Sequence, residues 1–310
     1  MQRLPAKERE LRNFLVRANQ KGSIIWVGSS NKEIYRLLQR EISTSNPDQD
    51  VHVVFGEVHP GVEGQTEFFN SLLVNGKARR RINGVTHLAL EYNGFDQERN
   101  DFQGMVDRFL VSGQDIFELV CPKSWNGSLI DRPMTSAAEM AAKNQTIKLA
   151  RAGCYNLVLA DLPDKISDKI EGSLGEYYSI VAREAFAVRR TAQRLNPNGK
   201  DVVFWLWGAS HAEKYRLPLH IKMQDPKAKV VSVVMNGGTY VHALAFDRVV
   251  RSLGWEGKTF ILKLGPSYRE GDYVVHIPTK GRSLYSGIST KGDPVLQHII
   301  EPSLNQQTAK

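Results

Sequence analysis

The segment VHVVFGEVHPGVEGQTEFFNSLLVNG, residues 51–76, carries the pattern that decides the fold. Its first part, VHVVFG (51–56), is a short apolar run typical of a buried strand, and TEFFNSLLVNG (66–76) is predicted to be a helix. A helix between two strands carries the chain back across the face of the sheet, so the next strand runs parallel to the first. The segment therefore predicts one unit of an α/β protein.

The same alternation runs through most of the chain. Strands are predicted at 23–28, 51–56, 85–92, 155–162, 201–208 and 229–235, with helices at 31–42, 66–76, 102–113, 136–153 and 175–195. Further strands at 239–246, 259–264 and 272–277 follow with short connections, which also permit antiparallel pairs. The sequence predicts an α/β fold with a mostly parallel central sheet, helices on both faces and C-terminal strands that include antiparallel ones.

Length and composition favour one globular domain. A chain of 310 residues with 41% hydrophobic content can bury a large core. We expect a single α/β domain over residues 1–300, with a strand-rich extension at 237–300 and a flexible tail at 301–310.

The cellular setting is predicted from the start of the chain and from the cysteines. No apolar run approaches the roughly 20 residues that cross a bilayer, and charges stand where a signal peptide would be apolar. Cys121 and Cys154 are too few for a disulfide framework, which favours a reducing compartment. We expect a cytoplasmic protein, or one exported by a route that needs no signal peptide, and no transmembrane segment.

The formal net charge is +8, and the densest basic run is KARRR at 77–81. Such a run is usually a solvated face, and the alternative is a site for phosphates or anionic membranes. The chain has no zinc-finger pattern and no RNA-recognition signature, and aromatic residues do not interleave with the basic run. We therefore expect no nucleic-acid partner.

Ionisable residues stand where several predicted strands end. Glu57 and His59 lie two residues apart, so their side chains would point to the same side of a strand. Glu91 ends HLALE, Asp161 ends NLVLAD, and His211 closes GASH after the strand at 201–208. Open parallel sheets bind ligands beyond the carboxyl ends of their strands. These side chains are expected to meet at one rim.

Such a group of residues has two chemical uses. Buried carboxylates without partners are costly, so clustered acids and imidazoles normally bind a cation or transfer protons. Two imidazoles with carboxylates suit Zn²⁺, Mn²⁺ or Co²⁺, and the predicted ligands are Glu57, His59, Glu91, His211 and Asp161. The metal would lower the pKa of a bound water and supply a hydroxide nucleophile.

Each of these residues also has a structural interpretation. His59 would cap the following helix, and Glu57 would anchor the backbone amides of the next loop. Glu91 would be a surface cap, and His211 would lie in a strand-to-helix turn beside a capping serine. Asp161 would stabilise its own loop.

A series of motifs in this order resembles the erythromycin-esterase-like and ChaN-like superfamily, and is similar also to the Tiki metalloproteases. The motifs are GEVHPG, TEFF, LALEYNGF, CPKSWNG, LVLADLP and FWLWGASHAEKYRLPLHI, and the likeness covers about residues 50–236. In that superfamily a Glu-x-His pair, a second glutamate and a Gly-x-x-His follow successive strands. The resemblance assigns these roles to Glu57, His59, Glu91 and His211.

The resemblance also suggests an arginine of the site, which matches Arg183 on the predicted helix 175–195. A guanidinium at that place would stabilise an oxyanion, whereas the alternative is a basic helical face shared with Arg189 and Arg190. The esterases also suggest a second histidine close to GASH. The nearest candidate here is His220, nine residues on.

The branches of the superfamily imply three different functions. Esterase-like members hydrolyse an ester, Tiki-like members cut peptides with a metal, and ChaN-like members bind haem at a cell envelope. Tyr92 and Tyr155 are the tyrosines that would ligate haem iron through a phenolate, although tyrosines beside strands usually serve packing. The lipoprotein signal of an envelope haem carrier is not found.

Our leading hypothesis is a hydrolase of an ester or amide that acts on a small-molecule or peptide substrate. His59 and His211 would flank a water molecule, with or without a divalent metal. Glu57 and Glu91 would act as ligands or as the general base, and Arg183 would stabilise the oxyanion. The alternatives are a ChaN-like protein that binds haem or iron, and a secreted toxin or effector that uses the same site.

Overall fold

The structure is a computed structural model, and the described part of the chain consists of several ranges. These are residues 5–28, 31–58, 64–73, 82, 84–93, 102–112, 137–197, 200–237, 240–265, 268–269 and 271–278. The basic run 77–81 and the expected tail 301–310 lie outside them. No helix among these residues is long and apolar enough to span a bilayer.

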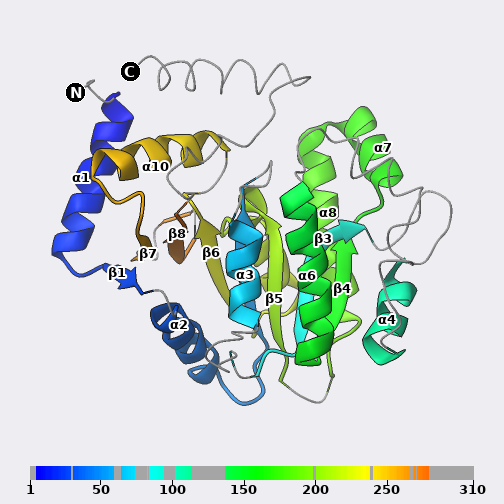
Figure 1. Ribbon diagram of the computed structural model, residues 1–310. Coiled ribbons are helices and arrows are strands. Elements are labelled where there is room, and N and C mark those ends of the chain that lie inside the picture. Colours follow the sequence, from blue (N-terminus) through cyan, green and yellow to red (C-terminus); the bar gives the residue numbers. More distant parts are fainter. Residues whose placement is uncertain are drawn as a thin grey trace.

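Eight strands form one mixed sheet (Figure 1). Their bounds are β1 Ile24–Val27, β2 Val51–Glu57, β3 His87–Asn93, β4 Asn156–Asp161, β5 Val202–Gly208, β6 Lys229–Met235, β7 Thr259–Lys263 and β8 Tyr273–His276. The strand order is β1-β7-β8-β6-β2-β5-β3-β4. All pairs from β8 to β4 are parallel, whereas β7 is antiparallel to both β1 and β8. This confirms the predicted fold class, with the antiparallel pairs at one edge.

Helices connect these strands. Their bounds are α1 Ala6–Gln20, α2 Lys32–Ser43, α3 Gln65–Leu73, α4 Phe102–Ser112, α6 Ala137–Gly153, α7 Asp164–Leu174, α8 Glu176–Ala192, α9 Leu217–Gln224 and α10 Tyr240–Ser252, with a 3-10 turn, η2, at Ala209–Ala212. The helices α2, α3, α4, α6 and α8 lie where the sequence predicts them. The helices α1, α7 and α9 were not predicted.

The predicted strand at 239–246 is wrong, because residues 240–246 lie in α10. Its β-branched and aromatic residues favour a strand when the segment is considered alone. The buried residues Ala243, Phe246, Val249 and Val250 instead recur at helical spacing along one side. Packing of that side decides the conformation, and His242, expected to alternate along a strand, lies on a helix.

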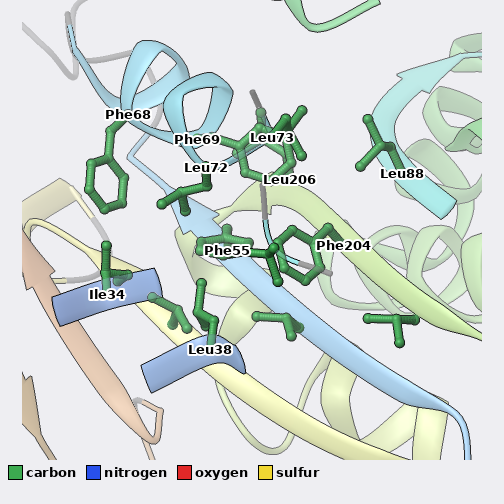
Figure 2. Packing of buried hydrophobic residues seen from close by; sticks show 14 of the residues in the cluster. Ile34, Leu38, Phe55, Phe68, Phe69, Leu72, Leu73, Leu88, Phe204 and Leu206 are labelled. Atoms are coloured by element: carbon green, nitrogen blue, oxygen red, sulfur yellow. The ribbon is translucent and has the colours of Figure 1, made fainter. Parts of the chain in front are cut away.

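Three apolar clusters fill the space between the helices and the sheet. One lies under α2, α3 and α6, and Figure 2 shows Ile34, Phe69 and Leu72 of these helices over Phe55 and Phe204 of the central strands. The other face carries two clusters, one with α8 and α9 and one with α1 and α10. The sheet is therefore covered on both faces, as expected for parallel strands.

Gly56 lets the turn η2 pack closely against β2. A β-carbon at this position would lie 2.7 Å from Cβ of Ala212 and 2.9 Å from Cα of Ala209. Neither atom belongs to a flexible side chain, so the turn itself would have to move. We expect Gly56→Ala to lower the free energy of unfolding by about 1–3 kcal/mol, the usual cost of overpacking.

Urea unfolding measures this change. Gly172→Ala is the matched control, because no atom lies within 4 Å of the added β-carbon, and alanine in α7 is expected to be neutral or stabilising. Equal stability of Gly56→Ala and the native protein would show that the close approach is not required.

His52 is buried in β2 and gives stability a dependence on pH. Burial lowers its pKa from 6.5 to about 4. Its Nδ1 accepts a hydrogen bond from Nε1 of Trp205 at 3.1 Å, which requires that this nitrogen carry no proton. Burial also lowers the pKa values of His87 and His276. His52 is therefore neutral in the folded protein near pH 6.

Stability should therefore fall as the solution is acidified. Between pH 6.5 and 4 the unfolded chain takes up a proton at residue 52, whereas the folded protein does not. The free energy of unfolding therefore decreases as the pH falls through this range, and the full contribution of His52 is present above pH 6.5. We expect about 2 kcal/mol to be lost between pH 7 and 5 through His52. Unfolding at several pH values measures this, and His52→Gln, which keeps an acceptor for Trp205, should give a shallower slope. An unchanged slope would contradict the assignment.

Candidate active site

The candidate site lies at the carboxyl ends of three neighbouring strands. The strands β5, β3 and β4 are adjacent in the sheet, and each ends near an ionisable residue. Glu91 lies near the end of β3, Asp161 ends β4, and His211 lies in η2 directly after β5. Helix α8 adds Arg183 from the side. The structure brings these four predicted residues together.

Arg183 lies between the two carboxylates. Its Nε and Nη2 donate to Oδ1 and Oδ2 of Asp161 at 2.9 and 2.6 Å, and Nη2 also donates to Oε1 of Glu91 at 2.6 Å. The Arg183 side chain is 21% exposed, so these ion pairs are only partly open to water. Burial alone would lower the pKa of Arg183, but the charges of Glu91 and Asp161 raise it above its ordinary value.

Backbone amides complete the bonding of both carboxylates. Oε2 of Glu91 accepts a hydrogen bond from the amide of Gly208 at 2.5 Å, and Oδ1 of Asp161 accepts one from the amide of Leu162 at 2.8 Å. In contrast, Nη1 of Arg183 has no hydrogen bond to any described residue. The guanidinium therefore keeps donors for a ligand.

His211 is held by a carboxylate on each side. Its Nδ1 lies 2.7 Å from Oε1 of Glu184, and because a carboxylate can only accept, Nδ1 carries the proton. Its Nε2 lies 3.7 Å from Oε1 of Glu91. The ring also packs edge-on against Trp207, with centroids 5.3 Å apart. Glu184 thus fixes both the orientation and the tautomer of the imidazole.

Glu184 is fully buried and is contacted by several basic side chains. Nε2 of His220 lies 3.4 Å from its Oε2, and Nε of Arg216 lies 3.8 Å from its Oε1. Among the described residues, none donates a hydrogen bond to Oε2 of Glu184 and none accepts one from the buried indole N–H of Trp207. Buried polar atoms in this state are typical of sites that bind water or a ligand.

Glu57 faces the other side of the sheet. It follows Phe55 at strand spacing, and Phe55 packs under α3. Oε2 of Glu57 accepts a hydrogen bond from Thr66 of α3 at 3.2 Å. The carboxylate at the end of β2 is therefore linked to α3, whereas Glu91 is linked to α8. His59 lies outside the described residues, so its distance from either group stays a prediction.

The described residues do not fit a divalent metal. No group of three or more histidine, cysteine, aspartate or glutamate side chains among them is arranged to hold one. The physical reason is that the guanidinium of Arg183 takes the place between Glu91 and Asp161 where a cation would bind. A ligand set that includes His59 stays a prediction.

Tyr155 also does not fit a haem ligand. It is buried, and its hydroxyl donates a hydrogen bond to the carbonyl of Leu73 at 3.0 Å. The phenol therefore serves packing under α3. The Tyr92 side chain lies outside the described residues.

Sequence reasoning missed Glu184 and left His220 unassigned. Glu184 follows Arg183 directly in the chain, but it belongs to no strand end and to no short motif. The signal that could have identified Glu184 is its place next to Arg183 on a predicted helix, because consecutive helical residues lie on adjacent sides of the helix. His220 stands far from GASH in sequence, yet α9 brings it to Glu184.

Comparisons with known proteins give only distant structural similarity. No protein-family model matches the chain, and no curated protein matches it. One similar structure is described as "Cofacial heme binding to ChaN of Campylobacter jejuni", with 17% identity, a TM-score of 0.39, and coverage of 79% of this chain and 90% of that one. A second, described as "Bacterial protein toxins", has 18% identity and a TM-score of 0.35. It matches 67% of this chain, which spans 35% of the toxin chain.

Proposed function

We propose that the protein is a hydrolase of an ester or amide in which His211 is the general base. The observation that supports this most is the 2.7 Å contact between Nδ1 of His211 and Glu184, which leaves Nε2 as the proton acceptor. A base of this kind removes a proton from water as the water attacks an acyl carbon. Glu184 is a positioning residue, because it acts on the substrate only through the imidazole.

Glu91 and Arg183 provide the charges that such a step requires. When Nε2 takes the proton from water, His211 becomes an imidazolium, and Oε1 of Glu91 at 3.7 Å stabilises the new positive charge. The hydroxide forms a bond to the acyl carbon, and its carbonyl oxygen becomes an oxyanion. Nη1 of Arg183 is the donor assigned to this oxyanion. The proton on Nε2 then passes to the leaving group as the acyl bond breaks.

The test is a survey of hydrolysis with a variant of the base beside the native protein. The substrates are p-nitrophenyl acetate, p-nitrophenyl butyrate and a fluorogenic peptide amide, assayed with and without a chelator. We expect turnover of at least one of them that the chelator leaves unchanged and that His211→Gln loses.

Two results would count against the proposal. One is the same turnover in the native protein and in His211→Gln. The other is the haem alternative, shown by a stoichiometric Soret band on adding haemin together with no hydrolysis of any of the three substrates.

A further inference from the structure

The two edges of the sheet differ in whether their outward backbone groups have hydrogen-bond partners among the described residues. At one edge, the side chain of Gln103 from α4 lies against β4 as a strand would. Its Nε2 donates to the carbonyl of Leu157 at 2.7 Å, and its Oε1 accepts from the amide of Leu159 at 2.8 Å. The backbone groups that β4 turns outward there are thus satisfied within the chain. This edge is closed to a further strand.

At the opposite edge, β1 has no further strand beside it among the described residues. The amide of Lys263 donates to the carbonyl of Ser23, and the register pairs Ile24 with Leu262. Because hydrogen-bonded and non-bonded pairs alternate in an antiparallel ladder, the N–H and C=O groups of Ile24 and Trp26 point away from β7. They have no hydrogen-bond partner among the described residues. In Figure 1, β1 lies at the border of the sheet beside β7.

Side chains at this edge line a cavity that could accept a side chain of a binding partner. Ile25 and Trp26 are 36% and 37% exposed. An open cavity of about 670 Å³ lies where β1 ends and β7 begins, and its lining includes Trp26, Asn31 and Lys258. Added strands gain affinity from backbone hydrogen bonds and specificity from pockets of this kind. The edge and the cavity together form a groove for an extended chain.

The charge around the groove is positive. Lys21 and Lys263 are exposed near the first residue of β1, Ile24, and Lys258 is exposed near the other end of the strand. Nζ of Lys258 lies 5.3 Å from the ring centroid of Trp26, which holds the ammonium at the cavity. Glu33 also lies at this edge, where its carboxylate accepts a hydrogen bond from the amide of Gly28. An acidic partner matches this distribution.

We propose that β1 binds an extended acidic peptide segment of a partner protein, which adds to the sheet as a further strand. The backbone of the segment bonds to the outward groups of Ile24 and Trp26. Its carboxylates contact the lysines at both ends of the strand, and one side chain enters the cavity beside Trp26. This function is independent of the chemistry proposed at His211.

The probe is an end-blocked hexapeptide of alternating valine and glutamate, and the matched peptide replaces glutamate by lysine. Fluorescence anisotropy measures binding to the full chain, and hydrogen exchange locates it. We expect the glutamate peptide to bind at least about tenfold more tightly, and the amides of Ile24 and Trp26 to exchange about tenfold more slowly. Lys258→Glu should weaken binding about fivefold or more, whereas Lys258→Arg should stay within about twofold.

Three results would overturn the proposal. The first is equal binding of both peptides, and the second is protection of amides away from β1 on addition of the glutamate peptide. The third is a dimer of the chain alone with the amides of Ile24 and Trp26 already protected, because a second copy would then be the occupant. The lysine variants are on the surface, so they test recognition without removing any core residue.

Discussion

His211→Gln is expected to slow hydrolysis by about a thousandfold, because a positioned general base contributes roughly 10²–10⁴ to the rate. Glutamine is close to histidine in size and can still bond to Glu184, so the site keeps its shape while it loses the acceptor for the proton of water. The loss should fall on kcat more than on KM, since the base acts in the transition state. Steady-state kinetics with the substrate found in the survey measures both.

The variants Glu184→Gln and His220→Gln distinguish the role of the general base, His211, from the roles of the residues around it. Glu184→Gln should reduce kcat less than His211→Gln and shift the pH profile, because the amide no longer balances the charge of an imidazolium. His220→Gln should keep most of the activity, since its ring lies 3.4 Å from Oε2 of Glu184, whereas His211 is bonded to Oε1. If kcat of His211→Gln were within about tenfold of the native value, His211 could not be the general base.

Arg183→Met is expected to lower the free energy of unfolding by about 3 kcal/mol, the lower part of the range for breaking a buried ion pair. The variant leaves Glu91 and Asp161 facing each other at the ends of neighbouring strands, without the cation that lies 2.6 Å from each. Thermal and urea unfolding measure the change. Activity should fall as well, because Nη1 is the donor assigned to the oxyanion.

Arg189→Met is the matched control for this change. Arg189 lies on the same helix and is exposed, so its replacement should alter stability by no more than about 0.5 kcal/mol. The cost of Arg183→Met should also shrink at high salt concentration, which screens the repulsion between Glu91 and Asp161. An equal cost at low and high salt would mean that lost packing, and not charge, sets the loss.

Most of the sheet was predictable because its strands are buried on both faces. Runs such as FWLWG (204–208) and KVVSVVM (229–235) have no polar face, which is the pattern of a central parallel strand. The order of the strands was not predictable from local patterns. The pairing of β1 with β7, near opposite ends of the chain, depends on contacts that no short window of sequence contains.

The helices that were missed or mistaken share a physical cause. Segment 239–246 has strand-forming residues, and only packing beneath α10 makes it a helix. Helix α9 is short and begins with a proline in its first turn, so its composition resembles a loop. Helix α7 carries exposed Ile166 and Leu174, which obscure an amphipathic pattern.

The site was predictable where it depends on strand ends and not where it depends on helices. Glu91, Asp161 and His211 converge because parallel strands end at one edge. Glu57 was expected with them, but alternation along β2 turns it towards α3. Glu184 has no strand-end signal, and its role depends on the position of α8, which packs against β4.

Arg183 and Glu184 are neighbours in the chain, and they serve two different partners. Arg183 contacts the acids at the ends of β3 and β4, and Glu184 contacts the imidazole of His211 in η2. A shift of α8 along its axis would disturb both at once. If the proposed activity is found, attempts to change its substrate preference should therefore keep this helix in place and vary the connecting segments around it, since the register of α8 sets the contacts of both side chains.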